Sequence, residues 1–93
     1  MAYTYILECI DGTFYTGSTV NLVKRLDEHQ AGEGANYTSK RIPVTLVYYE
    51  KYESVAVAFL REKQIQNWSH KKKKALINSN FCDLSFFAKK KFD

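Results

Sequence analysis

Cysteine and long apolar runs are scarce in this sequence. Its 93 residues include two cysteines, Cys9 and Cys82, which are too few for a zinc site and show no spacing typical of a disulfide framework. We therefore expect both thiols to be reduced packing residues. The longest apolar stretch, Val55 to Leu60, is far too short to cross a bilayer. These absences predict a soluble, cytoplasmic protein with no membrane partner.

Internal repeats, low-complexity segments and linkers are also missing. A hydrophobic content of 45% in 93 residues is enough for one modest core but not for two. We expect residues 1–80 to form one domain. The basic and aromatic tail, residues 81–93, is expected to pack on that domain as a short helix.

The formal net charge of +4 is unevenly distributed along the chain. Residues 68–93 contain seven lysines and two aspartates, whereas residues 1–67 contain seven basic and eight acidic side chains. A basic segment favours a phosphate-rich partner such as nucleic acid. A solvated helix face that aids solubility explains the same composition equally well.

Two segments rich in β-branched and aromatic residues, Tyr3 to Cys9 and Thr13 to Gly17, predict a β-hairpin. A two-residue loop would place Tyr5 and Tyr15 on opposite faces of the sheet. A three-residue loop with Gly12 in the left-handed region would place both tyrosines on one face. We predict the three-residue loop.

A helix is predicted from Leu22 to about Gln30, with Thr19 or Asn21 as its N-cap. Its helical periodicity of about 100° per residue defines a buried stripe. The apolar members of this stripe are Leu22, Val23 and Leu26.

Arg25 and His29 lie one turn apart on the border of that stripe. Taken alone, they are typical boundary residues whose stems cover the core while their polar ends reach water. Tyr15 and Gly17 come shortly before the helix, however, so a phenol, an open backbone position and a guanidinium would meet at one corner. This stretch predicts a chemical site.

The next segment, Ala35 to Pro43, is long for a loop in a compact domain and carries Tyr37 and Lys40. Such loops often contain binding groups, and a solvated connector is an equally good interpretation. Val44 to Tyr49 is nearly continuously apolar, which predicts a central strand covered on both faces.

A second helix, Val55 to about Asn67, is capped by Ser54 and places Glu62 within an apolar arc near Val55 and Phe59. A carboxylate in this position needs a compensating cation, because burying an unpaired charge costs several kcal/mol. The cation is either a structural partner such as Arg25 or a divalent metal. Magnesium is often held by one or two carboxylates together with substrate phosphates.

A third helix is predicted to begin at Ser69, which can cap it, and to end at residues 78–80. It carries four consecutive lysines, Lys71 to Lys74, which point to all sides of a helix, so some of them must be solvated.

The order Tyr5, Tyr15-Thr16-Gly17, Arg25, His29 and Glu62 resembles the GIY-YIG nuclease superfamily, in particular its small stand-alone bacterial proteins. The resemblance covers residues 3 to about 78. Each of the two name-giving tripeptides is degenerate, but the full ordered set is specific. It implies an α+β fold, a three-stranded antiparallel sheet flanked by helices, and a phosphodiesterase site that uses one divalent ion, Mg²⁺ or Mn²⁺.

By this resemblance, Glu62 holds the metal, Tyr15 binds or deprotonates the attacking water and Tyr5 supports it. Arg25 contacts the scissile phosphate, and His29 assists proton transfer or positions a phosphate oxygen. We expect further contacts with nucleic acid from a set of backbone, aromatic, amide and basic groups: Gly17, Tyr37, Lys40, Asn67, Lys71 and Lys72. Ser18 stands where some members have a lysine, and Lys40 is a candidate to replace it in space.

The sequence therefore predicts a metal-dependent endonuclease that acts on nucleic acid, with DNA favoured, in repair or recombination. A protein partner would then supply specificity, because no further DNA-binding domain accompanies the nuclease-like region. One alternative is a nucleic-acid-binding module that keeps the fold without turnover. Another is a structural adaptor in which Arg25 and Glu62 form an ion pair.

Overall fold

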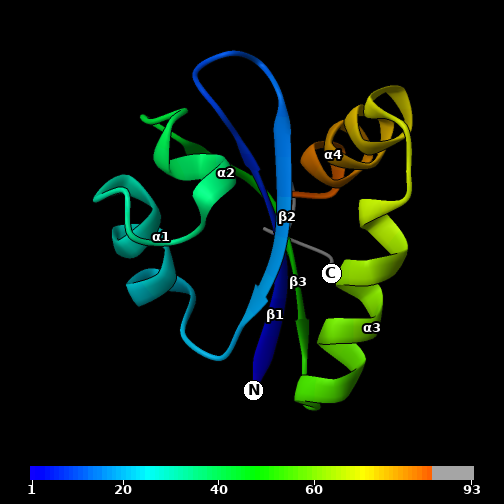
Figure 1. The fold of residues 1–93 in the computed structure, drawn as a ribbon. Coiled ribbons are helices and arrows are strands. Elements are labelled where there is room, and N and C mark those ends of the chain that lie inside the picture. Colours follow the sequence, from blue (N-terminus) through cyan, green and yellow to red (C-terminus); the bar gives the residue numbers. More distant parts are fainter. Residues whose placement is uncertain (85–93) are drawn as a thin grey trace.

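The computed structural model describes residues 1–84 and contains a three-stranded antiparallel sheet with four helices. The sheet order is β2-β1-β3. Figure 1 views the sheet from its β2 edge, with α1 and α2 on one side and α3 and α4 on the other. The predicted α+β fold is confirmed. The elements are β1 Ala2–Glu8, β2 Phe14–Thr19, α1 Leu22–Gln30, α2 Asn36–Ser39, β3 Thr45–Tyr52, α3 Val55–Gln66 and α4 His70–Leu84.

The β1–β2 hairpin has the predicted three-residue loop. Tyr5 pairs with Gly17 and Leu7 with Tyr15, and Gly12 adopts a φ of 84° in the turn. This register places the rings of Tyr5 and Tyr15 on the same face, with centroids 6.4 Å apart. The prediction that both tyrosines share a face is confirmed.

The predicted central position of the third strand is wrong. β3 pairs only with β1 and is an edge strand, with a register irregularity between Ile6 and Leu7 of β1. The apolar run suggested that both faces of the strand are covered. In the structure, the adjacent Tyr48 and Tyr49 point to opposite faces: Tyr48 is buried, while Tyr49 is exposed and packs edge-on against Tyr3. An exposed tyrosine can cover a neighbouring strand and keep its hydroxyl in water.

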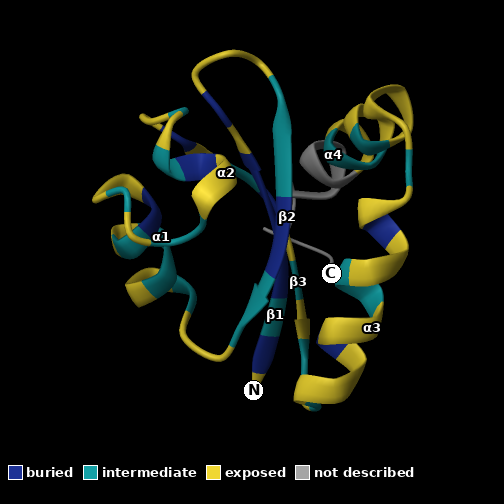
Figure 2. Ribbon diagram, in the orientation of Figure 1, coloured by how far each residue is buried: buried dark blue, intermediate teal, exposed yellow. Residues whose placement is uncertain are grey.

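The central strand β1 contributes to a core on each face of the sheet. Buried segments run along β1 in Figure 2. On the α1 side the core combines Tyr5, Leu7, Cys9 and Val44 with Leu22 and Leu26. On the other side it combines Ile6, Tyr48 and Ile65 with Phe14, Val47, Trp68, Leu76 and Ile77.

Each predicted cap residue accepts a backbone hydrogen bond at the start of its helix. The side chain of Asn21 accepts from Lys24 N. In the same way, Ser54 Oγ accepts from Val57 N and Ser69 Oγ accepts from Lys72 N. The predicted end of the last helix at residues 78–80 is wrong, because α4 continues to Leu84. The tail, residues 81–93, was predicted to form a separate helix, but its first four residues belong to α4. The rest of the tail, residues 85–93, lies outside the described part of the chain.

The apolar stripes predicted for two helices are partly wrong. Val23 on α1 and Val55, Phe59 and Leu60 on α3 are exposed. The inward face of α3 instead carries the small Ala58, whose carbonyl accepts a hydrogen bond of 2.7 Å from Thr4 Oγ1. The small Ala58 lets α3 approach β1 at this point, and the larger inward residue is Ile65, two turns further along the helix.

Candidate functional site

A chain of hydrogen bonds connects β1, α1 and α2 behind the site. The Tyr5 hydroxyl lies 2.9 Å from His29 Nε2, and His29 Nδ1 lies 2.8 Å from Thr38 Oγ1. Thr38 Oγ1 donates its one hydrogen to the carbonyl oxygen of Ala35, 3.2 Å away. Thr38 must therefore accept from His29 Nδ1–H, which leaves Nε2 to accept from the Tyr5 hydroxyl. The backbone of α2 thus sets the tautomer of His29.

His29 is fully buried and neutral. Burial, with a smaller contribution from the nearby positive charge of Arg25, lowers its pKa to about 4. Both ring nitrogens are already occupied by Tyr5 and Thr38. The geometry therefore favours an orienting role for His29 over direct contact with a phosphate.

Arg25 lies on α1, one turn before His29, and is nearer the surface than the hydrogen-bonded residues described above. Its Nη1 donates to Glu28 at 3.0 Å, and its Nη2 donates to the carbonyl oxygen of Gly34 at 2.8 Å. The hydrogen bond to Glu28 raises the pKa of Arg25. With a side chain 30% exposed, Arg25 also lines a surface cavity of about 310 Å³ at the start of α1. It can reach a ligand while its geometry is held from two sides.

Both tyrosines are neutral phenols at physiological pH. Burial raises the pKa of Tyr5 to about 12, although the Arg25 guanidinium beside it acts in the opposite direction. Burial also raises the pKa of Tyr15, again partly offset by Arg25. The ring of Tyr15 packs against His29 and Tyr37, with centroids 5.2 and 6.1 Å away. Tyr15 is therefore fixed in place and protonated.

Glu62 belongs to α3, on the opposite face of the sheet from these groups. Ser18 Oγ donates to its Oε1 at 2.6 Å, and Gln66 Nε2 donates to its Oε2 at 2.8 Å. Lys63 Nζ lies 3.8 Å from Oε2. The Arg25–Glu62 ion pair weighed above is not formed in the described residues, where Arg25 is paired with Glu28.

The neighbouring arginine of α3 does not neutralise Glu62 either. Arg61 Nε and Nη2 donate to the two oxygens of Glu50 on β3, at 2.9 and 3.0 Å. This two-point ion pair is directed toward β3, away from β2. Glu62, with a side chain only 12% exposed, therefore has Lys63 as its cationic neighbour among the described residues.

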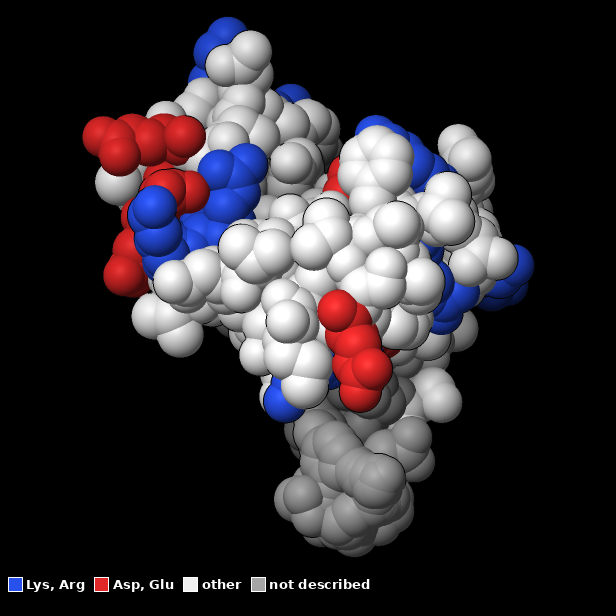
Figure 3. All heavy atoms as spheres, turned by 90° about the horizontal axis from the view of Figure 1, so that it is seen from below, with Lys and Arg blue, Asp and Glu red and all other residues white. Residues whose placement is uncertain are grey.

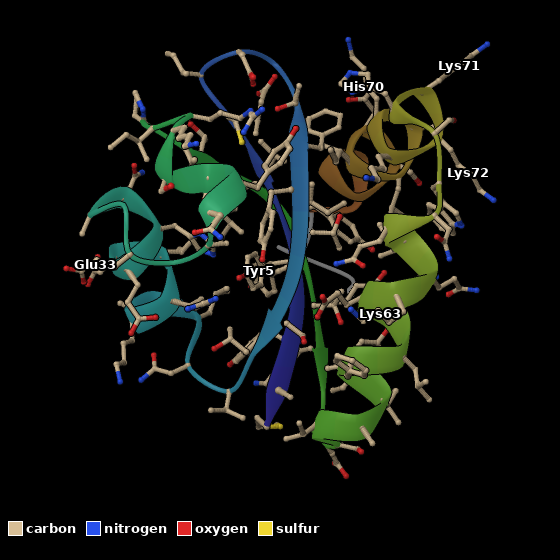
Figure 4. The ribbon with its side chains drawn as sticks, viewed as in Figure 1. Tyr5, Glu33, Lys63, His70, Lys71 and Lys72 are labelled. Atoms are coloured by element: carbon tan, nitrogen blue, oxygen red, sulfur yellow. The ribbon has the colours of Figure 1, made fainter. Side chains whose placement is uncertain are left out.

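The two halves of the site meet around the edge of β2. In Figure 4, Tyr5 lies on the α1 side of β2, and Lys63, the neighbour of Glu62, lies on the α3 side. The charge of Glu62 nevertheless raises the pKa of both Tyr5 and Tyr15, so the carboxylate is within electrostatic range of both phenols. The site is a rim around an edge strand, with β2 between the guanidinium and the carboxylate.

Gly17 allows the close packing of this rim. A Cβ at Gly17 would lie 2.6 Å from the Tyr5 hydroxyl oxygen and 3.1 Å from a ring carbon of Tyr15. No larger residue fits unless Tyr5 moves. The absence of a side chain at Gly17 therefore allows Tyr5 and Tyr15 to pack closely against β2.

The remaining predicted contact residues are spread over the surface. Tyr37 stacks on Tyr15 and lies under the Arg41 guanidinium, 4.0 Å from the ring centroid, so it borders the site. Lys40 and Asn67 are exposed and follow α2 and α3. Lys71 and Lys72 point outward from α4 in Figure 4, well away from Tyr5. These four polar residues are not gathered at the rim.

Sequence reasoning missed four residues that support the site: Ser18, Gly34, Thr38 and Gln66. Gln66 had a signal, because an amide four residues after an acidic side chain faces it on a helix. A Cβ at Gly34 would lie 2.3 Å from His29 Nδ1, a contact created by the path of the loop. No sequence spacing reveals that contact.

The charged surface near Arg25 is mixed. Figure 3, seen from the bottom of Figure 1, shows acidic and basic side chains gathered on the α1 side and a broad uncharged area beside them. Lys24 and Arg25 both lie within 4.0 Å of Glu28. Arg25 therefore lies among acidic neighbours and not within a wide positive surface.

The donor set fits a hard divalent cation better than zinc. Among the described residues, no three His, Cys, Asp or Glu side chains converge on one point. Glu62 offers a single carboxylate whose two oxygens each accept one neutral donor and keep a lone pair. Magnesium tolerates one protein carboxylate because water and phosphate oxygens complete its shell.

Comparisons with known proteins agree with this arrangement. Residues 1–75 match the family described as the GIY-YIG catalytic domain. A UPF0213 protein of Natronomonas pharaonis is 48% identical over 75 residues, which cover 81% of this chain and 88% of the relative. A UPF0213 protein of Syntrophus aciditrophicus is 51% identical over 79 residues, which cover 84% and 91%.

A solved structure is also similar. The solution NMR structure of a UPF0213 protein from Bacillus halodurans aligns with a TM-score of 0.54 at 39% identity and covers 84% of each chain. Fold and sequence together define a small domain of the nuclease type. The chain belongs to the GIY-YIG family, as its residues predicted. Members of this family generally bind nucleic acid and use a divalent metal.

None of the helices in residues 1–84 has the length and apolar character to span a membrane.

Proposed function

We propose that this protein is a metal-dependent endonuclease that hydrolyses phosphodiester bonds in nucleic acid, with DNA as the favoured substrate. The observation that carries the proposal is the geometry of β2: Gly17 packs against Tyr5 and Tyr15 on the α1 side, and the adjacent Ser18 donates to Glu62 at 2.6 Å on the α3 side. A phenol, a guanidinium and a carboxylate are the groups needed to hold a water, a phosphate and a cation. A role in repair or recombination, with a protein partner that supplies specificity, follows as part of the same proposal.

Arg25 would bind the scissile phosphate. Its planar fork can contact two phosphate oxygens, and its positive charge is insensitive to pH near neutrality. Hydrolysis places additional negative charge on these oxygens, so a fixed guanidinium stabilises the transition state more than the substrate. Glu28 and the Gly34 carbonyl hold the guanidinium without enclosing it.

Tyr15 would position the attacking water. Because burial raises its pKa, Tyr15 is protonated near neutral pH and is a poor base in the protein alone. Its hydroxyl can still accept a hydrogen bond from water and direct the oxygen lone pair toward phosphorus. Attack forms the new P–O bond as the bond to the leaving sugar oxygen breaks; the water gives up a proton to solvent, and the leaving oxygen takes one up from solvent.

Tyr5 and His29 would support this geometry from behind. The Tyr5 hydroxyl hydrogen is committed to His29 Nε2, so its oxygen can only accept from the groups in front of it. Glu62 would hold Mg²⁺ or Mn²⁺, which when bound lowers the pKa of a coordinated water and neutralises phosphate charge. Lys40, Asn67, Lys71 and Lys72 would add mainly sequence-independent affinity for the nucleic acid.

The alternative is a nucleic-acid-binding module of the same fold without turnover. The experiment compares cleavage of branched, nicked and linear DNA, with RNA as a further substrate, in Mg²⁺ or Mn²⁺. Cleavage by the wild type that is lost in both Arg25→Ala and Glu62→Ala supports the enzyme. Tight, salt-sensitive binding without cleavage in any metal supports the binding module and contradicts the proposal. Gln64→Ala, an exposed substitution on the same helix as Glu62, serves as the control.

A further inference from the structure

We infer that Ser18 and Gln66 are positioning residues that hold the carboxylate of Glu62 in the orientation in which it binds the divalent metal. This inference rests on the proposed function and extends it to two side chains outside the family motif. It concerns the atoms that contact Glu62, not the metal's own geometry.

The first observation is that each oxygen of Glu62 has its own neutral donor. Ser18 Oγ donates to Oε1 at 2.6 Å, and Gln66 Nε2 donates to Oε2 at 2.8 Å. A hydroxyl and an amide satisfy part of the hydrogen-bonding capacity of a carboxylate but leave its full negative charge. The ammonium of Lys63 lies further off, 3.8 Å from Oε2.

The second observation is that both donors tie α3 to the strand that carries Tyr15. Ser18 belongs to β2, and the same Gln66 Nε2 also donates to the carbonyl oxygen of Thr16 on β2, at 3.1 Å. The carboxylate is therefore fixed relative to β2 at two points. Such anchoring would hold Glu62 in one orientation for a bound metal, because partners of metal ligands orient the ligand.

The alternative is that the two residues only fasten the helix to the strand. A fastening role predicts that their removal lowers the free energy of unfolding without changing the metal affinity of the folded protein. A positioning role predicts weaker metal binding in variants that are still folded. Metal affinity and stability therefore separate the two roles.

The test is titration of the full chain with Mn²⁺ by isothermal calorimetry, with folding of every variant checked by circular dichroism. Ser18→Ala and Gln66→Met are expected to bind Mn²⁺ about 10-fold or more weakly than the wild type. Methionine keeps the length of glutamine, so Gln66→Met preserves packing and removes only the donor. Ser18→Thr retains the hydroxyl and should restore binding.

Gln64→Ala is the matched control, because Gln64 is an exposed amide on α3 whose partner is Arg61. It should bind Mn²⁺ like the wild type, and Glu62→Ala should not bind. If folded Ser18→Ala and Gln66→Met bind Mn²⁺ as tightly as the wild type, the inference is wrong and the proposed metal site stands. If the wild type binds neither Mn²⁺ nor Mg²⁺, the proposed function fails, and the inference fails with it.

Discussion

The hydroxyl of Tyr5 donates a hydrogen bond to Nε2 of His29 over 2.9 Å, and both side chains are buried. This relationship fixes the direction of every hydrogen bond behind the site, from Tyr5 through His29 and Thr38 to a backbone carbonyl. A phenol whose hydrogen is used in this way cannot donate to a substrate. In the mechanism that we propose, Tyr5 therefore supports the site and Tyr15 is the phenol that positions the water.

The neutral state of His29 predicts loss of stability in mild acid. Its pKa of about 4 in the folded chain lies below the ordinary value of 6.5, so the unfolded chain binds an extra proton between these pH values. The contribution of neutral His29 to the free energy of unfolding is fully present above about pH 6.5 and falls as the pH drops. On the order of 3 kcal/mol is lost near pH 4. Urea unfolding at pH 7, 5.5 and 4.5 measures it.

The control variant for this effect is His29→Gln. It lacks the imidazole but keeps all the Asp and Glu side chains of the wild type, which also titrate in acid. Its stability should fall less steeply over the same pH range than that of the wild type. Equal slopes in the two proteins would show that His29 does not govern acid stability.

Thr38→Val should disturb His29 without changing the size of the buried side chain. Valine cannot accept from Nδ1–H, so a buried donor is left without its partner, at a cost of about 1–3 kcal/mol. We expect lower stability and a change in the ¹⁵N chemical shifts of the His29 ring. Ser39→Ala, which removes an exposed hydroxyl from the next residue, is the control and should change neither. Unchanged imidazole shifts in Thr38→Val would contradict the assigned tautomer.

Gly34→Ala should destabilise the protein although Gly34 has no left-handed conformation. The new methyl group would lie 2.3 Å from His29 Nδ1, and His29 is held at both nitrogens and cannot move aside. We expect a loss of about 1–3 kcal/mol by urea unfolding, together with a displaced acceptor for Arg25. Gly32→Ala is the contrast, because Gly32 has a φ of 81° and open space around it, so only backbone strain of about 1 kcal/mol applies. An effect of Gly34→Ala no larger than that of Gly32→Ala would count against the contact.

Arg25→Lys should reduce cleavage strongly although the charge is kept. A lysine ammonium cannot contact Glu28, the Gly34 carbonyl and two phosphate oxygens with one planar group. We expect a fall in kcat of about 100-fold or more, the usual effect of losing a donor aimed at developing charge. Lys24→Arg, on an exposed neighbour, is the control. Activity of Arg25→Lys within a few fold of the wild type would show that a positive charge alone is sufficient.

Local signals in the sequence predicted much of the fold. The turn around Gly12 set the hairpin register, and Asn21, Ser54 and Ser69 marked the starts of three helices. These features depend on residues close together in the chain, where a side chain satisfies a nearby backbone group. The ordered motif then identified the family.

Contacts between distant segments were not predictable in the same way. The apolar pattern of α3 suggested that Val55 and Phe59 face the core, but both are exposed, and the small Ala58 faces β1 instead. The sequence indicated that Glu62 needs compensation and suggested a cation. The structure supplies the Lys63 ammonium at 3.8 Å together with two neutral donors, Ser18 and Gln66, of which Ser18 lies 44 residues away in the chain.

The three-residue hairpin loop has a consequence for how this domain can change in evolution. Side chains alternate along β2, so Tyr15 faces one pair of helices while Ser18 reaches the other. A one-residue slip of the strand, caused by adding or deleting one residue in the loop, would exchange the sides of Tyr15 and Ser18. Length variation at the exposed tip of this hairpin should therefore occur in steps that preserve the parity of the strand, even though a surface turn usually tolerates insertions of any size.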